Sequence, residues 1–362
     1  EAVPEHRDKI PTIFEQTNLP VEQENLTIGR ELFAKRQSCP ETMAEFEAAL
    51  LDNTQRGWRR LGAFDPAERS HTLDLLGFEV QLVLPTLAFH QVAHIKDDDA
   101  LAAGAYLLNK AMGEFCQHDA RLKAIGYLPL SLGPERAKEI MDQGFADGCY
   151  SYIVETNEPD NDRPSFTHPT FDPVWAGFAN SNTPFAVHVA ANGDYQAVSP
   201  SFKNNGKDEL ELGGDAPAGE LGVLTIGNSA QLFLAALIFD GVFDRHPGLR
   251  AISMEHAASW LPSWLKSLDF TTKLFKRKRP FVEEPSVTAK KRIKVSPFAG
   301  EPVGWIIEQV GPEMLVFASD YPHPEGSPDP IAIFESTMQN CDQATMDAFY
   351  YGNMANVMGI AV

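Results

Sequence analysis

The chain has 362 residues, 43% of them hydrophobic and 22% charged, which is the composition of a globular protein with a buried core. Its formal net charge of −20 argues against binding to nucleic acid, because the overall field repels a polyanion. We find no run of about 18 apolar residues that would predict a membrane span. The N-terminus, Glu1-Ala-Val-Pro-Glu5, has neither an initiator methionine nor the features of a signal peptide. We therefore expect a cytoplasmic protein with no membrane partner.

The cysteines argue against two kinds of structural cross-link. The four of them lie far apart, and no Cys-x-x-Cys spacing occurs. This pattern disfavours a structural zinc site and a dense disulfide framework. Reduced thiols in a cytoplasmic enzyme are the simplest interpretation. The residues are Cys39, Cys116, Cys149 and Cys341.

Apolar periodicity predicts a helical N-terminal segment over 1–70, followed by alternating strands and helices. Two segments with few periodic apolar positions, 191–222 and 276–291, are predicted to be loop excursions. The predicted strands are 77–85, 122–130, 148–155, 184–190, 249–256, 292–298 and 314–319. The predicted helices are 41–51, 100–116, 134–144, 171–180, 229–243, 260–274, 303–310, one that begins at 328, and 342–358.

Strands that alternate with helices predict an α/β fold whose parallel sheet is built from right-handed crossovers. No Gly-x-Gly-x-x-Gly follows a strand, so a dinucleotide-binding sheet is disfavoured. We expect one domain over 1–362, folded as a (β/α)₈ TIM barrel. Only seven strands are visible, so one is either hidden in the helical N-terminal segment or encoded upstream of Glu1. The absence of an initiator methionine favours the second alternative.

Ionisable residues stand where three predicted strands end. His188 ends the fourth strand, Glu255 and His256 end the fifth, and Asp320 ends the seventh, three residues before His323. In a parallel barrel the carboxyl ends of the strands meet at one mouth. An imidazole and a carboxylate facing each other there could hold a divalent ion, or act as an acid/base pair without one.

Each of these residues also has a structural interpretation. His188 could be a hydrogen-bonded core residue, Asp320 could cap the following turn, and His323 could be a rigid turn residue between prolines. His90, just after the first strand, could be an ordinary loop histidine. A functional interpretation is favoured for the group because several such residues occupy the ends of different strands.

Five stretches resemble segments of one enzyme family. They are Phe317-Ala-Ser-Asp-Tyr-Pro-His-Pro-Glu-Gly326, Pro184-Phe-Ala-Val-His188, the segment from Gly241 to Trp260, His168-Pro-Thr-Phe-Asp-Pro-Val-Trp175 and Gly352-Asn-Met-Ala-Asn356. Together they resemble the amidohydrolase superfamily, in the branch that contains aminocarboxymuconate-semialdehyde decarboxylase and γ-resorcylate decarboxylase. The resemblance runs in order from about residue 77 to residue 360.

This resemblance implies one divalent metal, Zn²⁺ or else Mn²⁺, with His188 and Asp320 as ligands. Asp320 could instead be a proton shuttle. The family's catalytic histidine at strand six corresponds here to Glu255, with His256 next to it, and strand alternation lets only one of the two face the barrel. The family's first strand carries a His-x-His pair, which is not visible here. The expected catalytic residues are Asp320, Glu255, His256 and His323, and the expected substrate contacts are His90, Trp260 and Tyr321.

The sequence therefore predicts a metal-dependent hydrolase or non-oxidative decarboxylase. Its expected substrate is a small aromatic or ring-derived carboxylic acid, and a homodimer is the expected assembly. One alternative is a metal-free barrel that binds a small ligand without catalysis. Another is an acidic scaffold or oligomerisation protein.

Overall fold

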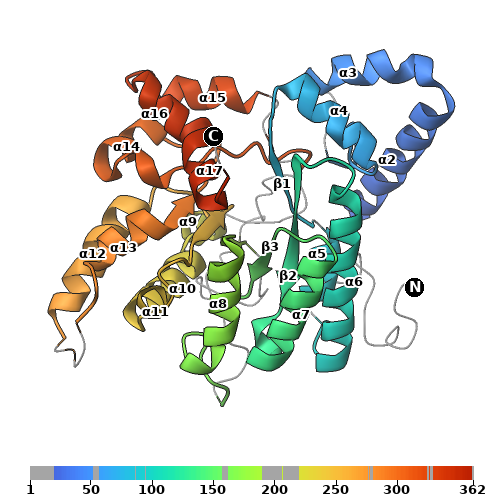
Figure 1. The fold of residues 1–362 in the computed structure, drawn as a ribbon. Helices are drawn as coiled ribbons and strands as arrows, with labels where there is room; N and C mark the ends of the chain where they lie inside the picture. The colour runs from blue at the N-terminus through green and yellow to red at the C-terminus, as the bar shows by residue number, and fades with distance from the viewer. Residues whose placement is uncertain are drawn as a thin grey trace.

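A computed structural model describes residues 20–51, 57–85, 87–93, 95–156, 162–189, 206, 220–275, 277, 280–323, 326 and 329–360. Its centre is a parallel sheet with the strands in chain order, β1 to β6, and Figure 1 labels the first three of them. The strands are β1 (Gln81–Val83), β2 (Leu122–Leu128), β3 (Ser151–Val154), β4 (Phe185–His188), β5 (Ala251–Met254) and β6 (Ile293–Val295). Sequential parallel pairing confirms the predicted α/β fold and is the strand order of a barrel.

Helices connect the strands and cover the sheet. One of them, α6, begins where the Asp97 carboxylate accepts a hydrogen bond from the Ala100 amide at 3.0 Å. Proline at the start of α7, α8, α12 and α13 fixes a helical φ where no amide partner is needed. The helices are α5 (Leu87–Ala93), α6 (Asp98–Cys116), α7 (Pro134–Ala146), α8 (Asp172–Ser181), α9 (Glu220–Thr225), α10 (Asn228–Phe239), α11 (Val242–Arg245), α12 (Leu261–Lys273), α13 (Pro285–Arg292) and α14 (Val303–Val310).

The core lies between these helices and the sheet. All four residues of β3 are buried, as expected for a strand covered on both faces. The Trp175 ring of α8 lies 5.3 Å from the Phe185 ring of β4 and 6.5 Å from the Phe233 ring of α10. This aromatic cluster joins strand and helices, and it fixes β4 so that its last residue, His188, has a defined position.

The predicted seventh strand is only partly present. Leu315 forms a single parallel bridge with Val295 of β6, and the Val316 amide donates to the Val295 carbonyl at 3.1 Å. The Phe317 amide instead donates to the Phe349 carbonyl at 3.0 Å, which ends the pairing. Met314 belongs to the 3₁₀ turn η7 (Pro312–Met314). Among the described residues no strand lies on the far side of this segment. Only the edge that faces β6 therefore has a pairing partner.

Two other predictions need correction. The excursion predicted at 276–291 contains helix α13. Its last turn carries three basic residues, whose positive charges interact favourably with the negative end of the helix dipole. The helix predicted at 229–243 is two helices, α10 and α11, because Gly241 takes a left-handed φ of 73° between them. The excursion predicted at 191–222 lies outside the described residues except for residue 206 and residues 220–222, and the last three belong to helix α9 instead of a loop.

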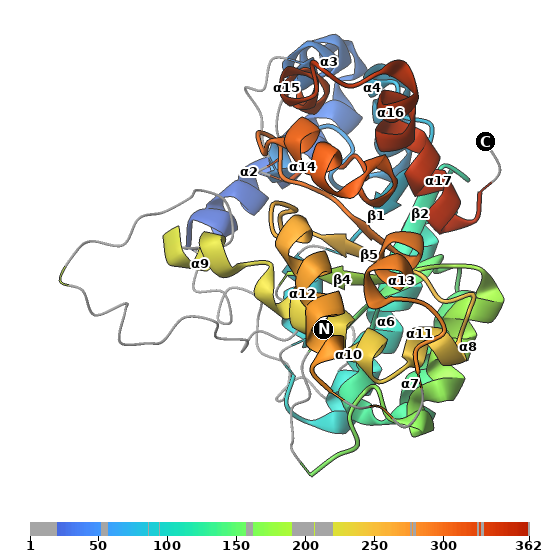
Figure 2. The ribbon, with the colours of Figure 1, turned by 90° about the vertical axis from the view of Figure 1, so that its left-hand side faces the viewer.

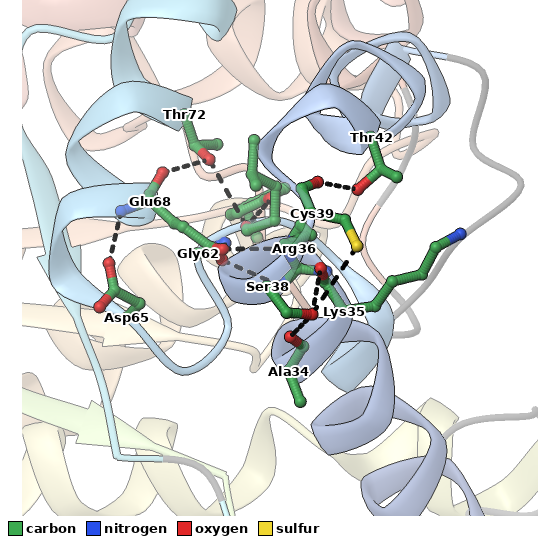
Figure 3. Close-up of polar contacts among 12 residues, drawn as sticks. Ala34, Lys35, Arg36, Ser38, Cys39, Thr42, Gly62, Asp65, Glu68 and Thr72 are labelled. Atoms are coloured by element: carbon green, nitrogen blue, oxygen red, sulfur yellow. Dashed lines mark hydrogen bonds and ion pairs between the residues drawn. The ribbon is translucent and has the colours of Figure 1, made fainter.

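The N-terminal helical unit comprises α2 (Pro20–Ser38), η2 (Pro40–Thr42), α3 (Met43–Leu51), η3 (Gly57–Arg59) and α4 (Pro66–Leu76), which confirms the helical prediction there. It lies at one end of the molecule (Figure 1). A buried ion pair holds it together, since Arg36 Nε and Nη2 donate to the two Glu68 carboxylate oxygens at 2.9 Å (Figure 3). Bidentate geometry of this kind is among the stronger ion pairs.

The C-terminal residues form α15 (Pro330–Thr337), α16 (Gln343–Asp347), the π-helical turn η8 (Ala348–Gly352) and α17 (Asn353–Met358). In Figure 2, α15 and α16 lie at the same end as α3 and α4. All four cysteines are free. Within the described ranges, one stretch, Glu220–Phe239, is long and apolar enough to span a membrane, with a mean hydropathy of 1.7. Its second half is α10, which buries Ala230, Phe233, Leu234, Leu237 and Ile238, so part of its apolar surface packs against the core.

Candidate functional site

The candidate site forms where β4 and β5 end side by side. Their register pairs His188 with Met254, which places Glu255, the next residue, beside His188. The His188 Nε2 atom lies 3.2 Å from Glu255 Oε1. The negative charge of Asp320 also acts on His188 and raises its pKa. The structure therefore brings together His188, Glu255 and Asp320, residues that are 67 and 65 positions apart along the chain.

A left-handed turn decides the orientation of Glu255 and His256. Glu255 has a φ of 58° and Ala257 a φ of 56°, so strand geometry ends at Met254. Glu255 faces His188. His256 is fully buried, with Nδ1 3.1 Å from Ser253 Oγ and Nε2 3.4 Å from Ser229 Oγ. The sequence left open which of the two residues faces the barrel. In the structure, Glu255 lies beside His188, and His256 is held by two serines.

Hydrogen bonding fixes the protonation of His188. Its Nδ1 lies 2.8 Å from the Val189 carbonyl, which can only accept, so Nδ1 carries a proton. Nε2 faces a carboxylate oxygen and must donate there too. Although burial lowers the pKa of His188, Glu255 and then the Val189 carbonyl raise it above its ordinary value. His188 is thus stabilised as an imidazolium ion.

The pKa values of the two neighbouring groups, Glu255 and His256, are both lowered. Burial opposes ionisation of Glu255, but His188 and then His323 lower the pKa of that carboxyl to about 2. Burial lowers the pKa of His256 to about 3, and the positive charge of His188 adds to this effect. These shifts favour an ion pair between His188 and Glu255 and a neutral imidazole at His256.

The chain leaves the sheet at Asp320, whose φ of 52° lies in the left-handed region. The His323 Nδ1 atom is 3.7 Å from Asp320 Oδ2, and the His323 amide donates to the Asp320 carbonyl at 2.9 Å. His323 also acts electrostatically on Glu255. All four expected catalytic residues, Asp320, Glu255, His256 and His323, consequently interact within one region.

The three expected substrate contacts are placed differently. His90 belongs to α5, but its side chain lies outside the described residues. The Trp260 Nε1 atom donates to the carbonyls of His256 and Ala257, at 2.9 Å each, and so supports the turn that follows β5. The Tyr321 hydroxyl donates to the Leu61 carbonyl at 2.5 Å. The polar atoms of Trp260 and Tyr321 thus already have partners within the chain.

The described residues do not complete a metal site. His188 donates from Nδ1 to a carbonyl, which is the usual support for a ligating Nε2. The 3.2 Å between His188 Nε2 and Glu255 Oε1 is close to the ligand spacing of a tetrahedral zinc site, about 3.3 Å. However, a catalytic zinc site takes three protein ligands, and among the described residues no group of three His, Cys, Asp or Glu side chains could hold a metal ion.

Sequence reasoning missed two carboxylates that shape the mouth. Glu155 directly follows β3 and accepts hydrogen bonds from Tyr127 Oη at 3.1 Å and from the Ser131 amide at 2.6 Å. Burial raises the pKa of Glu155 to about 7. Glu301 accepts from the Ala258 and Ser259 amides after β5. The rule that singled out His188, a polar residue directly after a buried strand, applies equally to Glu155.

Comparison with known proteins supports the fold and the family. A family model described as Amidohydrolase matches residues 23–360. No curated protein matches the chain.

Several solved structures share the fold. An amidohydrolase from Mycobacterium avium subsp. paratuberculosis K-10 is 23% identical, with a TM-score of 0.69 over 82% of this chain and 74% of that one. A 5-carboxyvanillate decarboxylase from Sphingomonas paucimobilis is 18% identical, with a TM-score of 0.60 over 81% and 83%. A dihydroxybenzoic acid decarboxylase from Polaromonas sp. JS666, with bound manganese and the inhibitor 2-nitroresorcinol, is 20% identical, with a TM-score of 0.60 over 80% and 85%.

Proposed function

Because the chain belongs to the amidohydrolase family, we propose that it is an enzyme acting on a small aromatic or ring-derived carboxylic acid, by decarboxylation or by hydrolysis. The observation that carries this proposal is the His188–Glu255 ion pair beside Asp320, at the ends of strands that are far apart in sequence. The 5-carboxyvanillate and dihydroxybenzoic acid decarboxylases that share the fold support the substrate class.

In the decarboxylation, the bond between the ring carbon and the carboxylate carbon breaks and CO₂ leaves. The electron pair stays on the ring carbon, which takes a proton from an acid at the mouth. We propose Asp320 as the group that delivers this proton, with His323, 3.7 Å away, as its partner. The imidazolium of His188 supplies positive charge that attracts the substrate carboxylate.

In the hydrolysis, a water molecule attacks the substrate carbonyl, and Asp320 accepts the proton that the water loses. The bond between the carbonyl carbon and the leaving group then breaks, and Asp320 returns the proton to the leaving group. Glu255 stays ionised in both reactions because His188 lowers its pKa to about 2. Its role is to hold the imidazolium, and we expect it to exchange no proton. His256, neutral and held by Ser253 and Ser229, supports the turn that carries Glu255.

One divalent metal is part of this proposal, with Zn²⁺ first and Mn²⁺ second. The manganese in the dihydroxybenzoic acid decarboxylase supports it. His188 and Asp320 would be the ligands from the described residues. With the metal bound, His188 would give up its Nε2 proton to coordinate through that atom, and the positive charge that attracts the substrate carboxylate would be that of the metal instead of the imidazolium. Elemental analysis of the purified protein, before and after dialysis against a chelator, tests this part separately.

The reaction is identified with a panel of aromatic carboxylates that includes 2,6-dihydroxybenzoate and 5-carboxyvanillate. Released CO₂ reports decarboxylation, and chromatography of the products reports hydrolysis. Glu255→Gln should lower kcat by about 100-fold, because the imidazolium loses its counter-ion. Glu308→Gln, an exposed change on α14, should have no effect. Equal activity in the two variants would contradict the proposed site.

A second candidate is a barrel that binds a carboxylate ligand without catalysis. The incomplete set of metal ligands among the described residues favours it. It predicts no bound metal, no gain of activity on adding Zn²⁺ or Mn²⁺, and saturable binding of 2,6-dihydroxybenzoate by calorimetry. A homodimer and a cytoplasmic location also remain proposals, and light scattering of the purified protein tests the first.

A further inference from the structure

The backbone of Asp320 is held in a costly conformation. Its φ of 52° lies in the left-handed region, which non-glycine residues rarely adopt. Such a conformation persists only when the surrounding structure enforces it. The His323 amide donates to the Asp320 carbonyl at 2.9 Å, and the Gly326 amide donates to the His323 carbonyl at 3.1 Å. These bonds close the loop, but both lie within the loop itself and do not anchor it to the rest of the molecule.

The side chain of the next residue, Tyr321, connects the loop to the rest of the molecule. Its hydroxyl donates to the Leu61 carbonyl of the N-terminal helical unit at 2.5 Å. The guanidinium carbons of Arg60 and Arg69 lie 5.1 and 5.4 Å from the centre of its ring, within the range of cation–π attraction.

The residues around the Tyr321 ring are themselves held by further contacts. Arg69 Nε donates to the Gly62 carbonyl at 2.7 Å, and Nη1 donates to Gln81 Oε1, on the first residue of β1, at 3.2 Å. A Cβ on Gly62 would lie 2.6 Å from the Arg69 Cα, so the two backbones are in close contact. The Gly62 amide in turn donates to Glu68, the partner of Arg36 (Figure 3). Tyr321 is thus fastened to the helical unit and, through Arg69, to the sheet.

We propose that Tyr321 is a positioning residue through which the N-terminal helical unit holds Asp320 at the mouth. This proposal rests on the proposed function only in giving Asp320 a role in the reaction. It differs from the substrate contact expected from the sequence, because the hydroxyl of Tyr321 is engaged by Leu61 and its ring by two arginines.

The first test measures the loop directly and needs no substrate. Tyr321→Phe keeps the ring and removes only the hydroxyl. Tyr152→Phe is the matched control, since Tyr152 is buried and its hydroxyl donates to the Met141 carbonyl at 2.6 Å, outside the mouth. Hydrogen exchange of peptides covering 319–326 should become about five-fold faster in Tyr321→Phe and stay unchanged in Tyr152→Phe. Unchanged exchange in a folded Tyr321→Phe protein would overturn the proposal.

The second test separates positioning from substrate contact. With 2,6-dihydroxybenzoate or 5-carboxyvanillate as substrate, Tyr321→Phe should lower kcat about ten-fold while KM stays within two-fold. Tyr152→Phe should change neither. A rise in KM alone would overturn the proposal in favour of a substrate contact. If Asp320→Asn keeps full activity, the proposed function fails, while the exchange measurement still decides whether Tyr321 holds the loop.

Discussion

Glu255 and His256 are neighbours in the chain with opposite electrostatic environments. Glu255 gains an imidazolium partner at 3.2 Å and stays charged. His256 is buried between two serine hydroxyls and stays neutral. A carboxylate and an imidazole therefore serve one site in different ways, the first as a counter-ion and the second as an uncharged support.

The buried neutral His256 makes the protein sensitive to acid. Its folded pKa of about 3 lies below the ordinary value of 6.5, so between these pH values the unfolded state binds one more proton than the folded state. His256 thus contributes to a loss of stability as the pH falls through that range. Between pH 6.5 and pH 4, the free energy of unfolding should fall less steeply in His256→Gln than in the wild type. The difference between the two slopes should be about 1.4 kcal/mol per pH unit.

Denaturant unfolding at half-unit pH steps measures this slope. His118→Gln, an exposed histidine with the same change in charge, is the control and should keep the wild-type slope. An unchanged slope in His256→Gln would contradict a depressed pKa at this position.

The sequence located these residues but not their orientation. Strand alternation predicts that Glu255 and His256 point to opposite faces. The prediction could not say which one reaches His188, because the chain leaves strand geometry at Glu255, with a φ of 58°. Local propensity does not predict a left-handed glutamate.

At the scale of elements, hydrogen bonds to one carboxylate connect two loops near the site. Glu301, in the loop between β6 and α14, accepts hydrogen bonds from the amides of Ala258, Ser259 and Phe298, at 3.0, 2.9 and 2.7 Å. Ala258 and Ser259 begin the turn that leads from β5 into α12. One carboxylate therefore joins the two loops that follow β5 and β6.

Replacing Glu301 with glutamine should cost stability. The amide side chain carries no charge and offers one acceptor oxygen in place of two, so at least one of the three backbone amides loses its carboxylate partner. We expect Glu301→Gln to lower the free energy of unfolding by about 1–3 kcal/mol, measured by urea denaturation. A loss no larger than that of the exposed Glu308→Gln would show that the loops are held by other contacts.

The strands show what periodicity can predict about this fold. Six apolar runs form parallel strands as predicted, because buried strands in a parallel sheet are apolar on both faces. The run 314–319 is equally apolar but forms only one bridge, at Leu315. Whether a run becomes a strand depends on a partner at its edge, and a local pattern contains no information about that partner.

At the scale of the molecule, the N-terminal helical unit contributes to the site. Its buried arginines, Arg60 and Arg69, contact Tyr321, the neighbour of Asp320. The sequence predicted helices here but gave no indication of this role, since the arginines and Tyr321 are more than 250 residues apart. Only the fold brings them together.

The stability of this unit should depend on its buried ion pair. Glu68→Gln leaves Arg36 buried without a counter-ion, which costs about 3–5 kcal/mol. Thermal unfolding followed by circular dichroism measures the loss. Glu47→Gln is the control, because Glu47 forms an exposed pair with His71 and should change stability by less than about 0.5 kcal/mol. Equal effects of the two changes would mean that the buried pair does not hold the unit together.

The central claim is that Asp320 exchanges a proton with the substrate at a mouth it shares with His188 and Glu255. The most direct measurement is the rate of CO₂ release or hydrolysis by Asp320→Asn, beside the surface control Asp74→Asn, on a substrate turned over by the wild type. The amide keeps the size of the side chain but has no acidic proton. We predict a loss of at least about 100-fold in kcat for Asp320→Asn and none for Asp74→Asn. Full activity in Asp320→Asn would contradict the claim.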